Sequence, residues 1–178
     1  MALRTALRTG ASVATVVTER VGGEKASWVL LAYRLPREPS TPRIAAWRRL
    51  KRLGAAQLLD GLVALPLDAR NKEQLEWVAD QVTEAGGQAS MWVAQVASRS
   101  DERAIVISLA TAVAEEYRAV ILEAAFARGA DQVARRRILA RLRRELRRIR
   151  YRDYFPPPEA DEARVAVHEL ASLVEANQ

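Results

Sequence analysis

Four short apolar runs in the first half of the chain set the tightest limit on its fold. Residues 27–35 form a continuous apolar run, which is typical of a strand buried on both faces. The runs 56–59 and 62–66 flank Asp60-Gly61, and Asp-Gly between apolar runs is a strong hairpin signal. Residues 89–97 show the pattern of a fourth strand. The sequence therefore predicts one strand, a hairpin and a final strand.

Two amphipathic segments separate these strands. Residues 42–53 and 72–85 place apolar side chains at intervals of three and four, so each segment predicts a helix with one buried face. Asn71 is placed to cap the second helix. The order strand–helix–strand–strand–helix–strand is that of a ferredoxin-like fold, with both helices on one face of an antiparallel sheet. We expect an α+β protein with a ferredoxin-like domain at residues 26–98.

The rest of the chain, residues 99–178, is expected to form a helical C-terminal region. Segments 101–128, 131–151 and 159–175 each repeat apolar side chains at helical spacing. We expect this region to pack on the sheet or to take part in a dimer. Residues 1–25 contain arginine, serine and threonine without a continuous apolar core, and we expect a disordered N-terminal extension there.

The net charge of +6 is concentrated in one predicted helix. Residues 131–152 hold ten arginines against Asp131 and Glu145, whereas residues 153–178 hold six acidic side chains against Arg164. At 100° per residue, the apolar side chains of this helix form one stripe and most guanidinium groups lie outside it. Such asymmetry indicates an electrostatic partner, which is either nucleic acid or the acidic tail itself.

A second basic cluster lies on the helix predicted for residues 42–53. Guanidinium and ammonium groups on an exposed helix can bind phosphates, although an ordinary solvated helix face accounts for the same pattern. The candidate DNA- or anion-binding residues on the two helices are Arg43, Arg48, Arg49, Lys51, Arg52, Arg136, Arg137, Arg143, Arg144, Arg147 and Arg148.

Composition argues against several classes of protein. The chain has no cysteine and one histidine, which excludes disulfides, thiol catalysis and multi-histidine metal centres. It has no apolar run of the roughly 18 residues that a membrane span needs. We therefore expect a soluble, cytoplasmic protein. No partner constellation of the kind that glycosidases or metal sites require accompanies its carboxylates, so we expect a non-enzymatic protein without a cofactor. The four tryptophans, at positions 28, 47, 77 and 92, lie on apolar faces of predicted elements, and we expect them in the core.

Several stretches of this sequence form a pattern, and the most specific block is Pro42-Arg-Ile-Ala-Ala-Trp-Arg-Arg-Leu-Lys-Arg-Leu-Gly-Ala55. It is accompanied by Trp28-Val-Leu-Leu, Glu76-Trp77, Gly86-Gly87-Gln-Ala and Arg152-Asp-Tyr-Phe-Pro156. Together these stretches resemble the N-terminal domain of the ChrB family of bacterial chromate-resistance regulators. The resemblance extends over roughly residues 26–172 and rests on the order and spacing of these blocks.

The resemblance implies a chromate-responsive regulator that binds duplex DNA and controls a chromate efflux operon. Typical members carry a second, C-terminal domain that these 178 residues do not contain, so the resemblance bears more directly on DNA binding than on chromate sensing. The basic cluster near Thr41–Arg43 could also hold chromate, a tetrahedral dianion. The alternative is an oxyanion-binding or assembly module without DNA affinity. Pairing of sheet edges would give a homodimer suited to a palindromic site.

A weaker similarity connects the strand–proline–basic helix–hairpin pattern with Cas2-like nucleases and with PaaX-type repressors. In those nucleases the first strand typically ends in Tyr-Asp, and the aspartate binds the metal. Here the corresponding pair is Tyr33-Arg34, and a guanidinium repels a divalent cation. The sequence therefore argues against a metal-dependent nuclease.

Overall fold

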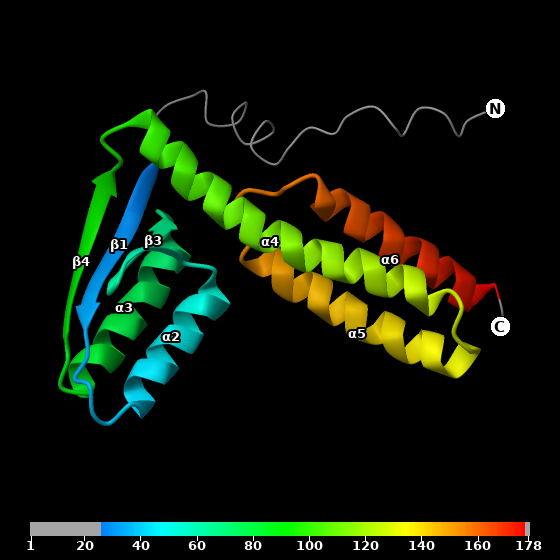
Figure 1. Cartoon of the computed structure of the whole chain (residues 1–178), viewed down its shortest axis with the longest axis horizontal. Coiled ribbons are helices and arrows are strands. Elements are labelled where there is room, and N and C mark those ends of the chain that lie inside the picture. The colour runs from blue at the N-terminus through cyan, green and yellow to red at the C-terminus, as the bar shows by residue number, and fades with distance from the viewer. Residues whose placement is uncertain (1–25, 177–178) are drawn as a thin grey trace. The chain divides into compact units, whose positions relative to one another are not determined.

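The computed structural model describes residues 26–176, and the extension expected at residues 1–25 lies outside them. The described chain forms two compact units (Figure 1). We call residues 26–109 together with 152–154 the sheet unit, and residues 110–151 together with 155–176 the helical unit.

The sheet unit has the predicted ferredoxin-like topology. Its strands are β1 (Ser27–Arg34), β2 (Ala56–Leu59), β3 (Leu62–Pro66) and β4 (Gln88–Gln95), in the order β2-β3-β1-β4. All three strand pairs are antiparallel. The helices α2 (Thr41–Leu53) and α3 (Ala69–Glu84) lie side by side against the sheet in Figure 1. The α+β prediction is confirmed.

One face of the sheet forms the core with both helices. Val29 and Leu31 of β1 point to this face, since side chains alternate along a strand. The other members of the cluster are Leu50, Leu53, Val63, Leu65, Leu75, Val78 and Val82. The opposite face buries Trp28, which is 1% exposed. The first residues of α4 (Arg99–Ala127) belong to the same unit, and the buried Glu102 accepts a hydrogen bond of 2.7 Å from the backbone N–H of Ala26.

The start of α3 differs from the prediction. Asp68, not Asn71, is the capping residue: its carboxylate accepts a hydrogen bond of 2.6 Å from the Asn71 backbone N–H. Asn71 is fully buried, and its side-chain amide donates to the Pro66 carbonyl and to Asp68 Oδ2, both at 2.9 Å. The prediction was wrong because spacing alone does not separate a capping residue from a residue inside the first turn.

Residues 152–154 return to the sheet unit after the chain has passed through α4 and α5. The Tyr154 hydroxyl lies 2.8 Å from the Leu53 carbonyl and 3.1 Å from Asn71 Oδ1, both of which are acceptors. Gly54 ends α2 with φ +71°, and a Cβ at Gly54 would lie 3.1 Å from Arg152 Cβ. Residues 152–154 therefore contact the C-terminal end of α2 and the first turn of α3.

The helical unit consists of α4 from Ala110 onward, α5 (Gln132–Tyr151) and α6 (Glu159–Glu175). The predicted apolar stripe of α5 is buried, with Leu139, Leu142 and Ile149 in the core of this unit. No helix within residues 26–176 is long and apolar enough to cross a membrane.

Candidate nucleic-acid interface

The side of α5 that faces away from the core carries a continuous row of guanidinium groups. Arg136, Arg143, Arg147 and Arg150 fall within an arc of roughly 60° at 100° per residue, and they extend over about 21 Å of helix axis. All four side chains are exposed. We call these four residues the α5 arginine stripe. Arg137 and Arg144 are also exposed, on the neighbouring part of the helix surface.

None of these six arginines forms an ion pair with another described residue. The remaining arginines of α5 are occupied: Arg141 pairs with Glu123, and Arg148 pairs with Glu145. The Arg135 guanidinium donates to the carbonyls of Arg128 and Ala130, which follow the end of α4, at 2.9 Å and 2.8 Å. The predicted candidate Arg148 is therefore engaged, whereas Arg150, which the sequence analysis did not include, belongs to the stripe.

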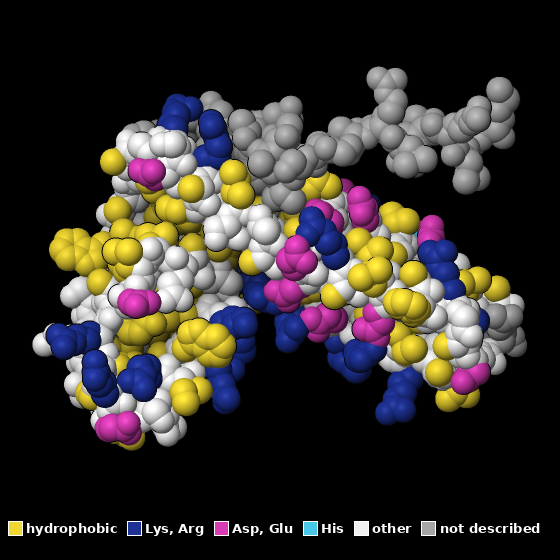
Figure 2. Space-filling model, in the orientation of Figure 1, with side chains coloured by type: hydrophobic (Ala, Val, Ile, Leu, Met, Phe, Trp, Pro, Cys, Tyr) yellow, Lys and Arg dark blue, Asp and Glu magenta, His cyan; other side chains and the backbone are white. Residues whose placement is uncertain are grey.

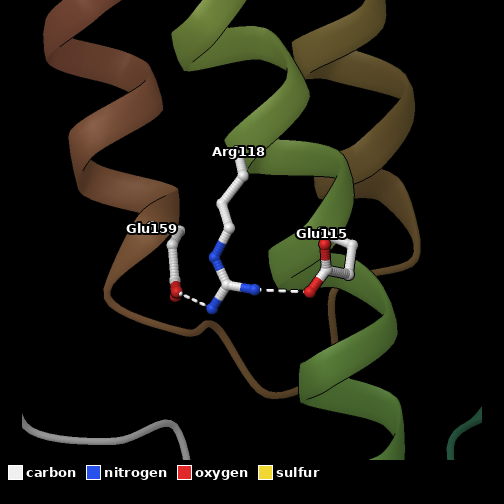
Figure 3. A network of polar contacts seen from close by, with 3 residues as sticks. All are labelled: Glu115, Arg118 and Glu159. Atoms are coloured by element: carbon white, nitrogen blue, oxygen red, sulfur yellow. Dashed lines mark hydrogen bonds and ion pairs between the residues drawn. The ribbon is translucent and has the colours of Figure 1, made fainter.

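Three acidic side chains of α6 have basic partners outside α5: Glu159 and Glu169 pair with Arg118 and Arg128, and Asp161 pairs with Arg164 of α6 itself. Glu159 binds Arg118 of α4 at 2.5 Å, and the same guanidinium binds Glu115 at 2.5 Å (Figure 3). The hydrogen bond and the charge of Glu159 raise the pKa of Arg118 above its ordinary value. Glu169 pairs with Arg128, which follows α4.

Within residues 26–176 no ion pair joins α5 to α6, although α6 is the acidic helix of the tail. In Figure 2, dark blue side chains gather along the lower margin of the helical unit, where α5 lies. Among the described residues, the α5 arginine stripe therefore forms no ion pair with the carboxylates of α6.

The second candidate surface is the exposed side of α2, a helix without an acidic residue. Arg43, Arg48, Lys51 and Arg52 are exposed. Arg49 is half-buried, and its guanidinium lies 5.3 Å from the centre of the Trp77 ring of α3. All five predicted residues thus lie on one helix, but Arg49 is held against a neighbouring aromatic ring.

Three of the four tryptophans lie at the surface, so the prediction that all four are buried was wrong. Trp47 is 51% exposed, with the Lys51 ammonium 5.1 Å from its ring centre. Trp77 is 47% exposed and Trp92 is 62% exposed. Ala46, Leu50 and Leu53 supply the buried face of α2, so the core does not need the indole of Trp47.

An open depression of about 460 Å³ lies where the end of β1 meets the start of α2 and the β2–β3 turn. Its charged lining residues are Arg34, Arg43 and Asp60, and Tyr33 and Trp47 supply aromatic rings. Burial and the charge of Asp60 raise the pKa of the Tyr33 phenol above its ordinary value. From the sequence, Asp60-Gly61 is predicted only as a turn, because a turn signal does not show what the turn contacts.

Residues 26–176 contain no group of three or more histidine, cysteine, aspartate or glutamate side chains that could hold a metal ion. At the end of β1, the position compared with the nuclease aspartate, Arg34 is exposed and lines the depression.

Comparison with known proteins places these features in a family. The family described as the N-terminal part of Protein ChrB matches residues 43–136, more than half of the chain, from α2 into α5. The chain belongs to the ChrB N-terminal family. Protein ChrB of Cupriavidus metallidurans is 29% identical over 134 residues, which cover 73% of this chain and 41% of that protein.

The chain spans about two-fifths of the length of the curated ChrB protein that it matches. An uncharacterized protein from Mycobacterium tuberculosis has a similar structure, with a TM-score of 0.52 at 16% identity, covering 92% of this chain and 68% of that one. At that identity the likeness concerns the fold alone.

Proposed function

We propose that this ChrB-family chain is a cytoplasmic, chromate-responsive transcriptional regulator that binds duplex DNA through α5 and α2. The observation that carries the proposal is the α5 arginine stripe, four exposed guanidinium groups without a carboxylate partner in the described chain. Its length of about 21 Å is close to the rise of roughly six base pairs along the axis of B-DNA, at about 3.4 Å per base pair.

Contacts of this kind bind the phosphate backbone by releasing counterions, and they do not read the base sequence. The basic side of α2 adds Arg43, Arg48, Lys51 and Arg52 as a second phosphate-binding surface. Trp47, which is exposed among these cations, is suited to stacking on a base or packing on a sugar. The binding we propose is therefore strongly dependent on salt.

The test measures duplex affinity as a function of salt by fluorescence anisotropy. Changing Arg136, Arg143, Arg147 and Arg150 together to glutamine should reduce the slope of log K against log salt by about 3 to 4. A matched variant changes four ion-paired arginines of the helical unit to glutamine and alters the net charge equally; they are Arg118, Arg128, Arg141 and Arg164. An equal loss of slope in both variants would show that net charge, not the stripe, drives binding.

Chromate responsiveness is tested on the protein–duplex complex of the full chain. Addition of chromate should release the duplex at a concentration at which sulfate, a tetrahedral dianion of the same charge, does not. Equal effects of the two anions would indicate a general ionic effect and would contradict a specific response.

A second candidate function, an oxyanion-binding module without DNA affinity, is supported by the depression at the end of β1. Arg34 and Arg43 both line this depression, and guanidinium groups suit tetrahedral oxyanions. This alternative predicts chromate binding by calorimetry that Arg34→Gln abolishes, with no detectable duplex binding even at low salt. Duplex binding that the stripe variant weakens would favour the regulator.

A further inference from the structure

The two edges of the sheet differ in their protection against pairing with another chain. An edge strand presents a row of free backbone N–H and C=O groups, and natural proteins blunt such edges by shortness, bulges or charge. β2 has only four residues, and its register with β3 shifts between Gln57 and Leu59. This edge is therefore short and irregular.

β4, the opposite edge, has none of these protective features. Its eight residues, Gln-Ala-Ser-Met-Trp-Val-Ala-Gln, include no charge, proline or glycine. All eight pair in regular register with β1 on one side, and no described strand pairs with the other side.

Large apolar side chains are exposed on both faces of β4. Trp92 and Val93 are consecutive, so they point to opposite faces of the sheet, and they are 62% and 61% exposed. Trp92 lies opposite Leu30 of β1, on the face away from α2 and α3. A strand added beside β4 would cover both side chains at once.

We propose that β4 pairs antiparallel with β4 of a second copy of this chain, joining two sheets into one. A second copy fits because an uncharged strand brings no like charges together when it meets itself, and because antiparallel pairing is the arrangement that a two-fold axis produces. The proposal concerns assembly alone and does not depend on DNA binding.

Symmetry restricts the register of this pair. A two-fold axis that relates antiparallel edge strands is perpendicular to the sheet, so each residue keeps its face in the partner. Directly opposite residues must therefore share a face. This is possible only when the two-fold axis lies midway between one residue and the same residue of the partner strand, so that this residue is directly opposite its own counterpart. Met91 and Trp92 are the two central residues of β4, so the two registers that pair the most residues place one or the other opposite its own counterpart.

The register is tested by engineered cysteines, because the natural chain has no cysteine. Opposite Cα atoms in an antiparallel pair lie about 4.5–5.5 Å apart, within the range of a disulfide. One of the variants Met91→Cys and Trp92→Cys should therefore form a covalent dimer under mild oxidation. Gln88→Cys and Gln95→Cys place their thiols at least about 20 Å apart and should not cross-link. Equal cross-linking at all four positions would overturn the proposal.

The assembly itself is tested by light scattering on the full chain, which should be a dimer at micromolar concentration. Trp92→Lys should weaken the dimer at least tenfold, because the two-fold axis places two ammonium groups near each other. Leu59→Lys adds the same charge to the exposed edge β2 and should leave the dimer intact. A monomeric natural chain, or equal weakening by the two variants, would overturn the proposal and leave the DNA-binding proposal standing.

Discussion

At the scale of single residues, Asn71 shows how much one buried polar side chain connects. Its amide donates to Pro66 and Asp68, its side-chain oxygen is within reach of the Tyr154 hydroxyl, and its backbone N–H binds the Asp68 carboxylate. A buried polar group is tolerated only when its hydrogen bonds are made. The sequence identified Asn71 as a residue of the helix start, but only the three-dimensional structure brings Tyr154 to it.

We predict that Asn71→Ala lowers the free energy of unfolding by about 2–3 kcal/mol, because it leaves the Pro66 carbonyl and the Tyr154 hydroxyl without this partner. Tyr154→Phe keeps the ring and should cost about 1 kcal/mol. Urea denaturation followed by circular dichroism measures both changes. A loss below about 0.5 kcal/mol for Asn71→Ala would contradict the role of this network.

Tyr33 gives a second prediction, on the dependence of stability on pH. Because burial and Asp60 raise the pKa of its phenol in the folded chain, the unfolded chain releases this proton first. The contribution of Tyr33 is fully present below the unfolded value of 10.0 and is lost as the pH rises through the higher folded pKa. The free energy of unfolding should therefore fall more steeply above pH 10 in the natural chain than in Tyr33→Phe, by at most about 1.4 kcal/mol per pH unit. Parallel curves in urea denaturation would rule this out.

At the scale of elements, the sequence predicts the strands and helices well but not what covers them. Apolar periodicity located α5 and the two strands of the hairpin, since period and turn signals are local properties. The same periodicity placed Trp47 and Trp92 in the core. It could not show that smaller side chains already fill the buried side of α2, or that the sheet face bearing Trp92 is partly open.

Two glycines with nearly the same backbone conformation allow a matched comparison. Gly61 lies in the β2–β3 turn and Gly86 lies between α3 and β4, with φ of +77° and +75°. A Cβ at Gly61 would lie 2.3 Å from the Tyr33 carbonyl oxygen, whereas a Cβ at Gly86 has no atom within 4 Å. Gly86→Ala should cost about 1–2 kcal/mol from the left-handed conformation alone, and Gly61→Ala should cost clearly more. Thermal unfolding of the two variants decides this, and equal melting temperatures would contradict it.

At the scale of the whole molecule, the two candidate surfaces lie on different compact units. The basic side of α2 belongs to the sheet unit, and the α5 arginine stripe belongs to the helical unit. The sequence predicted both clusters from charge and periodicity. It could not show which arginines are free. Glu123 meets Arg141 only through the packing of α4 and α5. Glu145 pairs with Arg148 across one turn of α5 itself.

If both units contact one duplex, the effects of their cations on salt dependence should add. Changing Arg43, Arg48 and Arg52 to glutamine should lower the salt slope by about 2 to 3, and combining this variant with the α5 stripe variant should give the sum of the two changes. Anisotropy titrations at several salt concentrations measure each slope. A combined variant no different from the α5 variant alone would show that α2 does not contact the duplex.

The return of residues 152–154 to the sheet unit has a consequence for biosynthesis. The strands and helices of this unit leave the ribosome well before Tyr154 does, since α4 and α5 are translated in between. Until then the end of α2 and the buried amide of Asn71 lack the hydroxyl that lies beside them in the finished structure. A released chain that ends at Tyr151 should therefore have a loosened sheet unit that proteases cut more readily, and a released chain that ends at Tyr154 should regain the resistance.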